Sequence, residues 1–144
     1  MKRPDLPAGK LNPTLLGELI SPRAPLPAEV LLGPRPGEDA CAIAVPKGTL
    51  VAATDPITLT GSDVGAHAVV INANDVAVTG VRPRWFLATV LLPSGTSEDA
   101  VRELFEAMHR ALELAGVVLY TFAPGAPRST VVKPRFEKFA RRSL

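Results

Sequence analysis

Residues 62–83 read SDVGAHAVVINANDVAVTGVRP, and this stretch decides most of what the sequence says about the fold. It is small and apolar over a length that suits one helix. Ser62 can accept hydrogen bonds from the first free NH groups, and Gly80 can end the helix in the left-handed conformation. We therefore expect a helix over residues 63–79.

A narrow polar stripe runs along this apolar helix. Asn72, Asp75 and Thr79 share one face, because residues three or four apart lie on the same side of a helix. A buried, unpaired carboxylate is costly, so Asp75 must face water, a cation or a ligand. Two interpretations stay open: Asp75 lies on a solvated or hydrogen-bonded structural face, or it coordinates magnesium.

The flanking segments predict strands. Residues 42–45 (AIAV) and 49–54 (TLVAAT) have the small and β-branched composition of strands, and the second would end at Asp55. Residues 85–92 (WFLATVLL) and 117–122 (VVLYTF) are typical of further buried strands.

The segment between the last two strands predicts a second helix. Thr96 and Asp99 resemble a capping box, and apolar residues repeat at helical spacing until Gly116. The order strand, strand, helix, strand, helix, strand predicts an α/β or α+β sandwich with helices over a sheet.

The chain divides into three regions of different composition. Residues 1–36 are rich in proline and contain one short amphipathic helix, LNPTLLGELI, so we expect an arm laid over the domain. Residues 37–122 carry the regular pattern. Residues 123–144 hold 6 Lys/Arg against 1 Asp/Glu, while residues 1–122 hold 10 against 13. The tail is therefore expected to be basic and irregular, and nucleic-acid binding by the body is not expected.

Length and composition favour one cytoplasmic domain. A chain of 144 residues buries roughly two thirds of its unfolded surface. No apolar run approaches the length of about 18 residues that a membrane span needs. The start, MKRPDLPAGK, lacks the apolar segment of a secretory signal. Cys41 has no partner for an internal disulfide, and we expect a small core residue rather than a reactive thiol.

Two further acidic spots precede the helix. Glu38 and Asp39 lie in a loop after Gly37, and Asp55 follows the second predicted strand. Each could be a solvated loop or turn residue. Together with Asp75 they could serve magnesium, which takes hard oxygen ligands and keeps several waters. His109 falls on the polar side of the second helix, and we expect it on the surface.

Three motifs in this order resemble the N-terminal domain of the AIR synthase (PurM-like) superfamily. They are GEDACAI (residues 37–43), TDPI (residues 54–57) and the stretch 62–83 quoted above. The segment GKLNPTLLGELI and the wording TDPIT look most like the branch of hydrogenase expression/formation proteins of HypE type.

The resemblance implies a PurM-like mixed sheet with helices on one face, and a homodimer in which two sheets pair. It implies Mg²⁺ and ATP as cofactors, with Asp39, Asp55 and Asp75 serving the metal. It further implies nucleotide or phosphate contacts by the residues Gly37, Glu38, Asp39, Gly61, Gly65 and Asn74. No catalytic residue follows from it. For the HypE branch the implied reaction is ATP-dependent dehydration of a thiocarboxamide, with hydrogenase maturation proteins as partners.

The sequence departs from the family pattern after residue 122. Family members continue with a Gly-Gly-[DH]-[ST] segment and a second domain, whereas this chain continues TFAPGAPRST and ends without a C-terminal cysteine. We expect a truncated member, and a frameshift is one origin of such a chain. The alternatives are a non-catalytic dimerisation or regulatory module of the same fold, or a fragment of an enzyme like thiamine monophosphate kinase.

Overall fold

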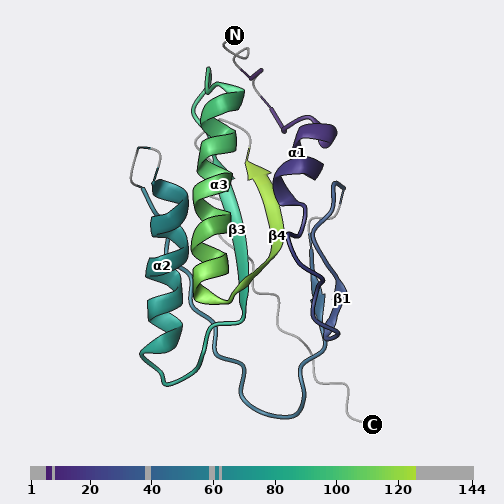
Figure 1. Cartoon of the computed structure of the whole chain (residues 1–144), viewed down its shortest axis with the longest axis vertical. Helices are drawn as coiled ribbons and strands as arrows, with labels where there is room; N and C mark the ends of the chain where they lie inside the picture. Colours follow the sequence, from purple (N-terminus) through teal and green to yellow (C-terminus); the bar gives the residue numbers. More distant parts are fainter. Residues whose placement is uncertain (1–5, 8, 38–39, 59–60, 62, 126–144) are drawn as a thin grey trace.

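In the part of the chain that the structure describes, the protein is a mixed α/β structure of three helices and four strands (Figure 1). The computed structural model describes residues 6–7, 9–37, 40–58, 61 and 63–125, the last eight by their backbone alone. Along the chain the elements are α1 (Pro13–Ile20), β1 (Val30–Leu32), β2 (Ala42–Ile43), α2 (Val64–Ala77), β3 (Trp85–Leu91), α3 (Glu98–Ala115) and β4 (Val118–Gly125). No helix among the described residues is long and apolar enough to cross a bilayer.

The strands form two separate pairs rather than one mixed sheet. β1 and β2 pair antiparallel, with Val30 opposite Ile43. β3 and β4 pair in parallel, from Trp85 opposite Val118 to Leu91 opposite Gly125. Parallel strands cannot be joined by a tight turn, and α3 provides the crossover between them.

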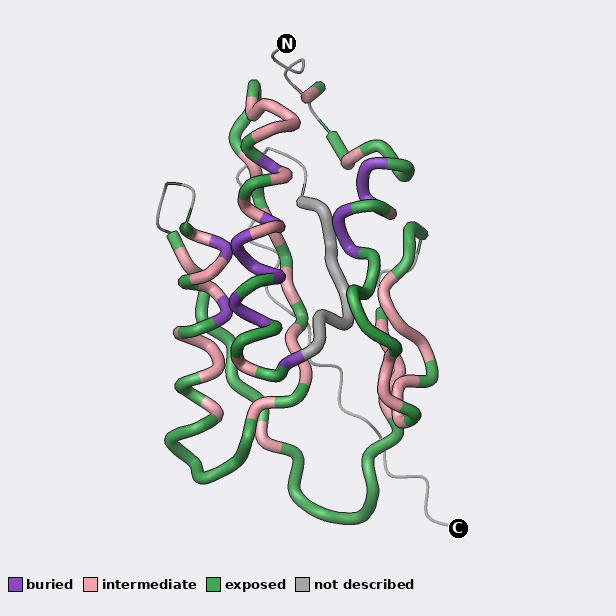
Figure 2. Tube along the Cα trace, in the orientation of Figure 1, coloured by how far each residue is buried: buried purple, intermediate pink, exposed green. Residues whose placement is uncertain are grey.

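Helix α3 is the centre of the core. On one side, four apolar residues of α1 pack with Val101 and Phe105 of α3. On the other side, Val69 of α2 packs with Met108 and Leu112 of α3. Figure 2 shows these buried positions facing one another across the three helices. Most of the apolar burial therefore depends on contacts between helices far apart in sequence.

Strand β3 has one covered and one open face. Phe86, Ala88 and Val90 pack against the helical core. Leu87 and Leu91 alternate with them and are 56% and 62% exposed. Because side chains of a strand point alternately to opposite faces, the helices cover one side of β3 and leave the other open.

The expected helices are present, with small shifts at their ends. α2 spans residues 64–77 within the predicted 63–79, and Gly80 adopts a left-handed φ of 82°. Ser62, the predicted cap, lies outside the described residues. α3 ends at Gly116 in the left-handed conformation, as predicted.

The predicted capping box of α3 is wrong. The hydroxyl of Thr96 donates to the carbonyl of Pro93 at 2.7 Å, so it is engaged in the preceding turn. Ser97 is the N-cap instead, and its hydroxyl accepts from the amide of Ala100 at 3.2 Å. Helix α1 also has a side-chain N-cap: Oδ1 of Asn12 accepts a hydrogen bond from the amide of Thr14 at 2.8 Å.

The strand predictions before α2 are largely wrong. The expected strand 42–45 shrinks to Ala42–Ile43, and β1, which the sequence did not predict, pairs with it. Residues 49–54 form no strand. A β-branched composition favours a strand, but a strand also needs a neighbour for its backbone groups, and the described residues place none beside this segment.

Candidate functional site

The polar stripe of α2 joins the loop that carries Asp55. The backbone amide of Asp55 donates to Oδ1 of Asn72 at 2.6 Å, and Nδ2 of Asn72 donates to the Asp55 carbonyl at 3.2 Å. Nδ2 also donates to the carbonyl of Ala68, one turn earlier, at 2.9 Å. The Asn72 side chain therefore binds both the NH and the C=O of Asp55. These two bonds position Asp55, which does not follow a strand as predicted.

This clamp brings two of the predicted metal ligands to one face of α2. Asp75 lies three residues after Asn72, so it is on the same side of the helix one turn along. Asp55 and Asp75 are both exposed to solvent, and so is Asn74. Exposure removes the cost of an unpaired buried carboxylate and leaves both carboxylates open to a ligand.

The donor set fits magnesium bound together with phosphate. Magnesium keeps several waters and is commonly held by one or two carboxylates plus substrate phosphates. Within the described chain no three His, Cys, Asp or Glu residues gather into a complete metal cage. Asp75 on α2 and Asp55 in the loop held against it are both exposed, which suits the open kind of site. Glu38 and Asp39 lie outside the described residues, so their predicted roles stay predictions.

The three predicted glycine contacts have different surroundings. Gly37 and Gly61 are exposed, have φ values of 90° and 116°, and have open space where a side chain would stand. Gly65 is buried against α3, where a Cβ would collide with the carbonyl oxygen of Leu104. The structure thus gives Gly65 a packing role that the sequence did not indicate, and its contact with phosphate stays a prediction.

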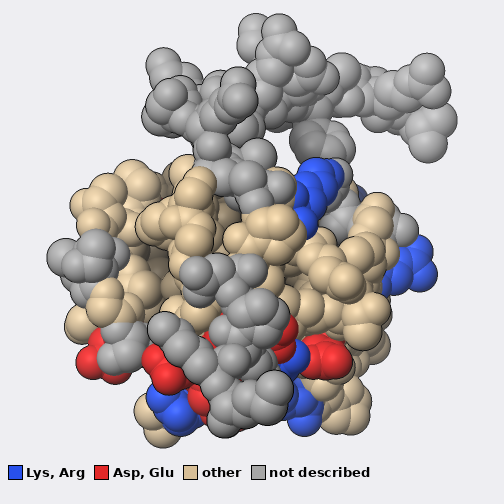
Figure 3. Space-filling view, turned by 90° about the horizontal axis from the view of Figure 1, so that it is seen from above, with Lys and Arg blue, Asp and Glu red and all other residues tan. Residues whose placement is uncertain are grey.

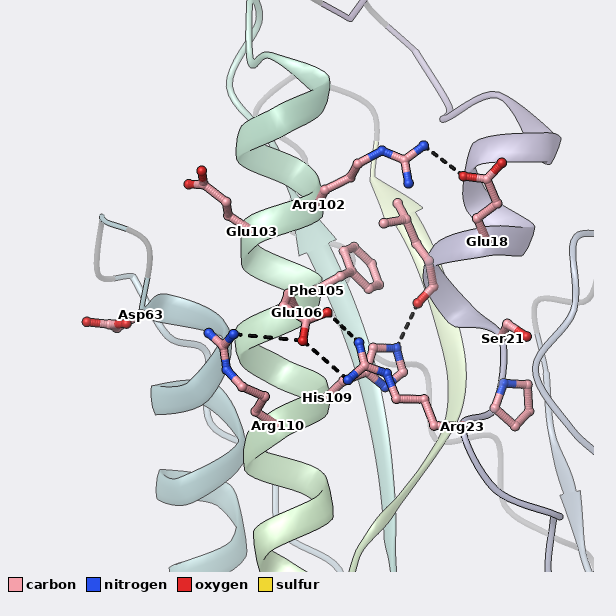
Figure 4. A pocket seen from close by; sticks show the side chains of 12 residues that line it. Glu18, Ser21, Arg23, Asp63, Arg102, Glu103, Phe105, Glu106, His109 and Arg110 are labelled. Atoms are coloured by element: carbon pink, nitrogen blue, oxygen red, sulfur yellow. Dashed lines mark hydrogen bonds and ion pairs between the residues drawn. The ribbon is translucent and has the colours of Figure 1, made fainter. Parts of the chain in front are cut away.

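A hollow of about 650 Å³ lies between the end of α1 and the middle of α3. Its rim carries many charges, and several of them form ion pairs with one another (Figure 4). Arg23 contacts Glu106 at 2.5 Å, and Arg102 contacts Glu18 at 2.7 Å. The hydrogen bond and charge of Arg23 lower the pKa of Glu106 below its usual value. These pairs fasten the N-terminal segment to α3.

His109 lies in the wall of this hollow, and its predicted surface position is wrong. It is only 8% exposed, and its Nε2 lies 2.8 Å from the carbonyl oxygen of Leu19 (Figure 4). The helical pattern places His109 on the polar side of α3. The N-terminal segment containing α1 then covers it, which the pattern of α3 alone cannot reveal.

The face seen in Figure 3 carries both acidic and basic side chains. Acidic and basic side chains lie among one another along one side of the molecule (Figure 3). Some charged side chains form ion pairs between distant segments, as Arg84 does with Glu29.

Burial raises the pKa of the Cys41 thiol, which keeps it protonated and weakly nucleophilic at neutral pH.

Sequence reasoning placed Asn72 on the polar stripe but assigned it no role in the site. Its signal was present: an amide one helical turn before Asp75 on an otherwise apolar helix. Its partner, the backbone of Asp55, is 17 residues away in the chain. No local pattern identifies such a partner.

Known proteins resemble this chain in sequence and in fold. Residues 37–121 match the family described as AIR synthase related protein, N-terminal domain. The carbamoyl dehydratase HypE of Rhodobacter capsulatus is 38% identical over 85 residues, which are 56% of this chain and 25% of that protein. The carbamoyl dehydratase HypE of Cupriavidus necator is 34% identical over 93 residues, 60% of this chain and 26% of that protein.

The fold has a similar counterpart among solved structures. The thiamine-monophosphate kinase of Stenotrophomonas maltophilia K279a superposes with a TM-score of 0.53 at 24% identity, covering 69% of this chain and 34% of that one. The chain thus spans about a quarter of the length of the two HypE relatives and a third of the kinase. Because the family match covers more than half of its residues, this chain belongs to the AIR synthase related proteins, and residues 37–121 correspond to their N-terminal domain.

Proposed function

We propose that this chain provides the magnesium–ATP site of a HypE-like hydrogenase maturation factor that acts in the cytoplasm. One observation carries the proposal: Asn72 holds the loop of Asp55 against the face of α2 that carries Asp75. The backbone of Asp55 thereby lies against the helix that carries Asp75, and both residues are exposed, which supports a shared metal site. Relatives bearing the name carbamoyl dehydratase HypE support the choice of branch.

Asp55 and Asp75 would hold the metal, together with Asp39 from the preceding loop. Bound magnesium would offset the negative charge of the phosphates. Around it, the open backbone at Gly37 and Gly61 would allow close approach of phosphate oxygens, with Glu38, Gly65 and Asn74 as the other predicted contacts. The exposed carboxylates leave room for the waters that magnesium keeps.

The chemistry of the complete factor would need more protein than this segment. The implied reaction converts a thiocarboxamide to a thiocyanate while ATP becomes ADP and phosphate, so the oxygen of the amide leaves on the phosphate. This chain corresponds to about a quarter of its HypE relatives. We therefore assign it nucleotide and metal binding, and place turnover in the assembly with the remaining parts and with hydrogenase maturation partners.

The decisive experiment measures ATP binding with and without magnesium by isothermal titration calorimetry. The wild-type chain should bind ATP in the presence of Mg²⁺, and Asp75→Asn should weaken this binding by roughly tenfold or more, the range seen when a metal site loses a supporting group. Glu103→Gln is the matched control, because it removes one exposed carboxylate from α3 outside the proposed site. Absence of magnesium-dependent binding up to millimolar ATP would refute the proposal.

The open face of β3 supports a second proposed function, homodimerisation through the sheet. Leu87 and Leu91 place two large apolar side chains on that face, and exposed apolar surface of this kind is a common site of association. A non-catalytic dimerisation module would use this face alone. Analytical ultracentrifugation should show a dimer that Leu87→Glu dissociates. Leu114→Glu is the control, since Leu114 is 90% exposed at the end of α3. A wild-type monomer at all concentrations would exclude this function.

A further inference from the structure

We infer that Asn72 is a positioning residue of the magnesium–nucleotide site, which holds the Asp55 carboxylate in place beside Asp75 for the metal. The inference rests on the proposed function. It assigns to Asn72 no contact with metal or nucleotide: its action passes through the backbone of Asp55.

The side-chain amide of Asn72 is itself held in one orientation. Nδ2 has two hydrogens, and the structure directs them to the carbonyls of Asp55 and Ala68. Oδ1 is then left facing the Asp55 amide, from which it accepts. The bond to Ala68 ties the amide to its own helix, so the two bonds to Asp55 transmit the rigidity of α2 to the loop.

The loop around Asp55 needs such a tie. Residues 44–58 form neither helix nor strand, and all but Val51 and Ile57 are exposed. Pro56 follows directly and has no NH with which to add another bond. Among the described residues 46–58, the hydrogen bonds found to the rest of the fold are the two to Asn72. Without them, the Asp55 carboxylate would have to be ordered each time a metal binds, which lowers affinity.

Only a side chain that both accepts and donates at this point can make the clamp. Asparagine offers one carbonyl oxygen and one NH₂ group, matching the NH and C=O of a peptide unit. Leucine has a similar shape and makes neither bond. Alanine also makes neither bond, and it favours the helix. Both substitutions therefore remove the clamp, leucine with the side-chain size kept and alanine with the side chain shortened.

The test compares wild type, Asn72→Ala and Asn72→Leu by three measurements. The hydrogen-exchange rate of the Asp55 amide shows whether its bond to Asn72 is intact. The midpoint of thermal unfolding shows whether the variant is still folded. The Mg²⁺ concentration for half-maximal ATP binding reports the metal site, with ATP affinity in EDTA as the metal-free reference. We expect faster exchange at Asp55 and a roughly tenfold higher magnesium requirement in both variants, with unchanged affinity in EDTA.

Thr79→Ala is the matched control, because the Thr79 hydroxyl donates to the carbonyl of Val76 in the turn that follows α2. It should leave the magnesium requirement unchanged. If Asp55 exchanges faster in a folded Asn72 variant while the magnesium requirement stays at the wild-type value, the inference is overturned and the proposed function stands. If the wild type itself shows no magnesium-dependent binding, the proposed function fails, and the inference falls with it.

Discussion

At Gly65 of α2 and Leu104 of α3, the backbones of the two helices are in direct contact, with no side chain between them. A Cβ on Gly65 would collide with the carbonyl oxygen of Leu104 and stand 3.1 Å from the amide nitrogen of Met108. Both obstacles are main-chain atoms of a helix, which cannot move aside as a flexible side chain can. The crossing of α2 and α3 therefore requires glycine at this position.

Gly65→Ala should destabilise the protein by about 3 kcal/mol, the upper part of the range for overpacked cores, because α2 must move away from α3. Urea denaturation would measure the loss. Gly17→Ala is the control in α1, where the new Cβ meets only the Pro36 side chain at 3.2 Å. There the better helix propensity of alanine, up to about 1 kcal/mol, offsets the contact. Equal stability of the two variants would show that the helices do not cross as described.

Two neighbouring valines of α2 should differ sharply when shortened. Val69 is fully buried, and Val70 is 51% exposed. Val69→Ala removes two buried methyl groups and should cost about 2 kcal/mol, since each buried carbon contributes about 0.8 kcal/mol and a cavity adds to the loss. Val70→Ala should change stability by less than about 0.5 kcal/mol. Chemical denaturation of both variants checks the rotation of α2 about its axis, and similar losses would contradict it.

The start of α3 offers a test of its cap. Ser97→Ala removes the acceptor for the Ala100 amide and should cost about 1 kcal/mol, whereas Ser97→Asp, another good N-cap, should restore most of it. Ser94→Ala, in the exposed turn before the helix, is the neutral control. Differential scanning calorimetry should give a lower melting temperature for Ser97→Ala than for Ser97→Asp, with Ser94→Ala close to wild type. A destabilised Ser97→Asp would argue against capping by this side chain.

The pair of Arg23 and Glu106 should make stability depend on pH in the acid range. The hydrogen bond from Arg23 lowers the pKa of Glu106 from its ordinary value of 4.5. A carboxyl with a lowered folded-state pKa stabilises the fold fully above its unfolded pKa, and this stabilisation is lost as pH falls through the folded pKa. The pair therefore contributes fully at neutral pH; its contribution begins to fall below about pH 4.5 and is lost once the pH drops below the lowered folded-state pKa.

The free energy of unfolding of wild type and Glu106→Gln, measured from pH 3 to pH 7, tests this directly. Wild type should be the more stable at neutral pH, and the difference should shrink in acid and in high salt. Glu103→Gln, on the same helix, should track wild type throughout. A difference that is as large at pH 3 as at pH 7 would mean that Glu106 acts by packing rather than by charge.

The outcome of sequence reasoning depended on how local each feature was. The helices α2 and α3 follow from periodicity and end glycines within the segment itself, and they appear close to their expected bounds. The run 49–54 has strand composition but forms no strand, because pairing needs a second segment that composition cannot supply. The pattern of α3 predicts His109 on the surface, but it is buried by a segment 90 residues earlier in the chain.

The sequence by itself determined the family and the helical placement of Asp75, because these depend on residue type and short spacing. The tertiary structure decided that Asn72 clamps Asp55, and that Gly65 serves the contact of α2 with α3. Both depend on which distant backbone groups come within hydrogen-bond or contact distance. Only the packing of α2 against α3 and the course of the loop 44–58 bring those groups together.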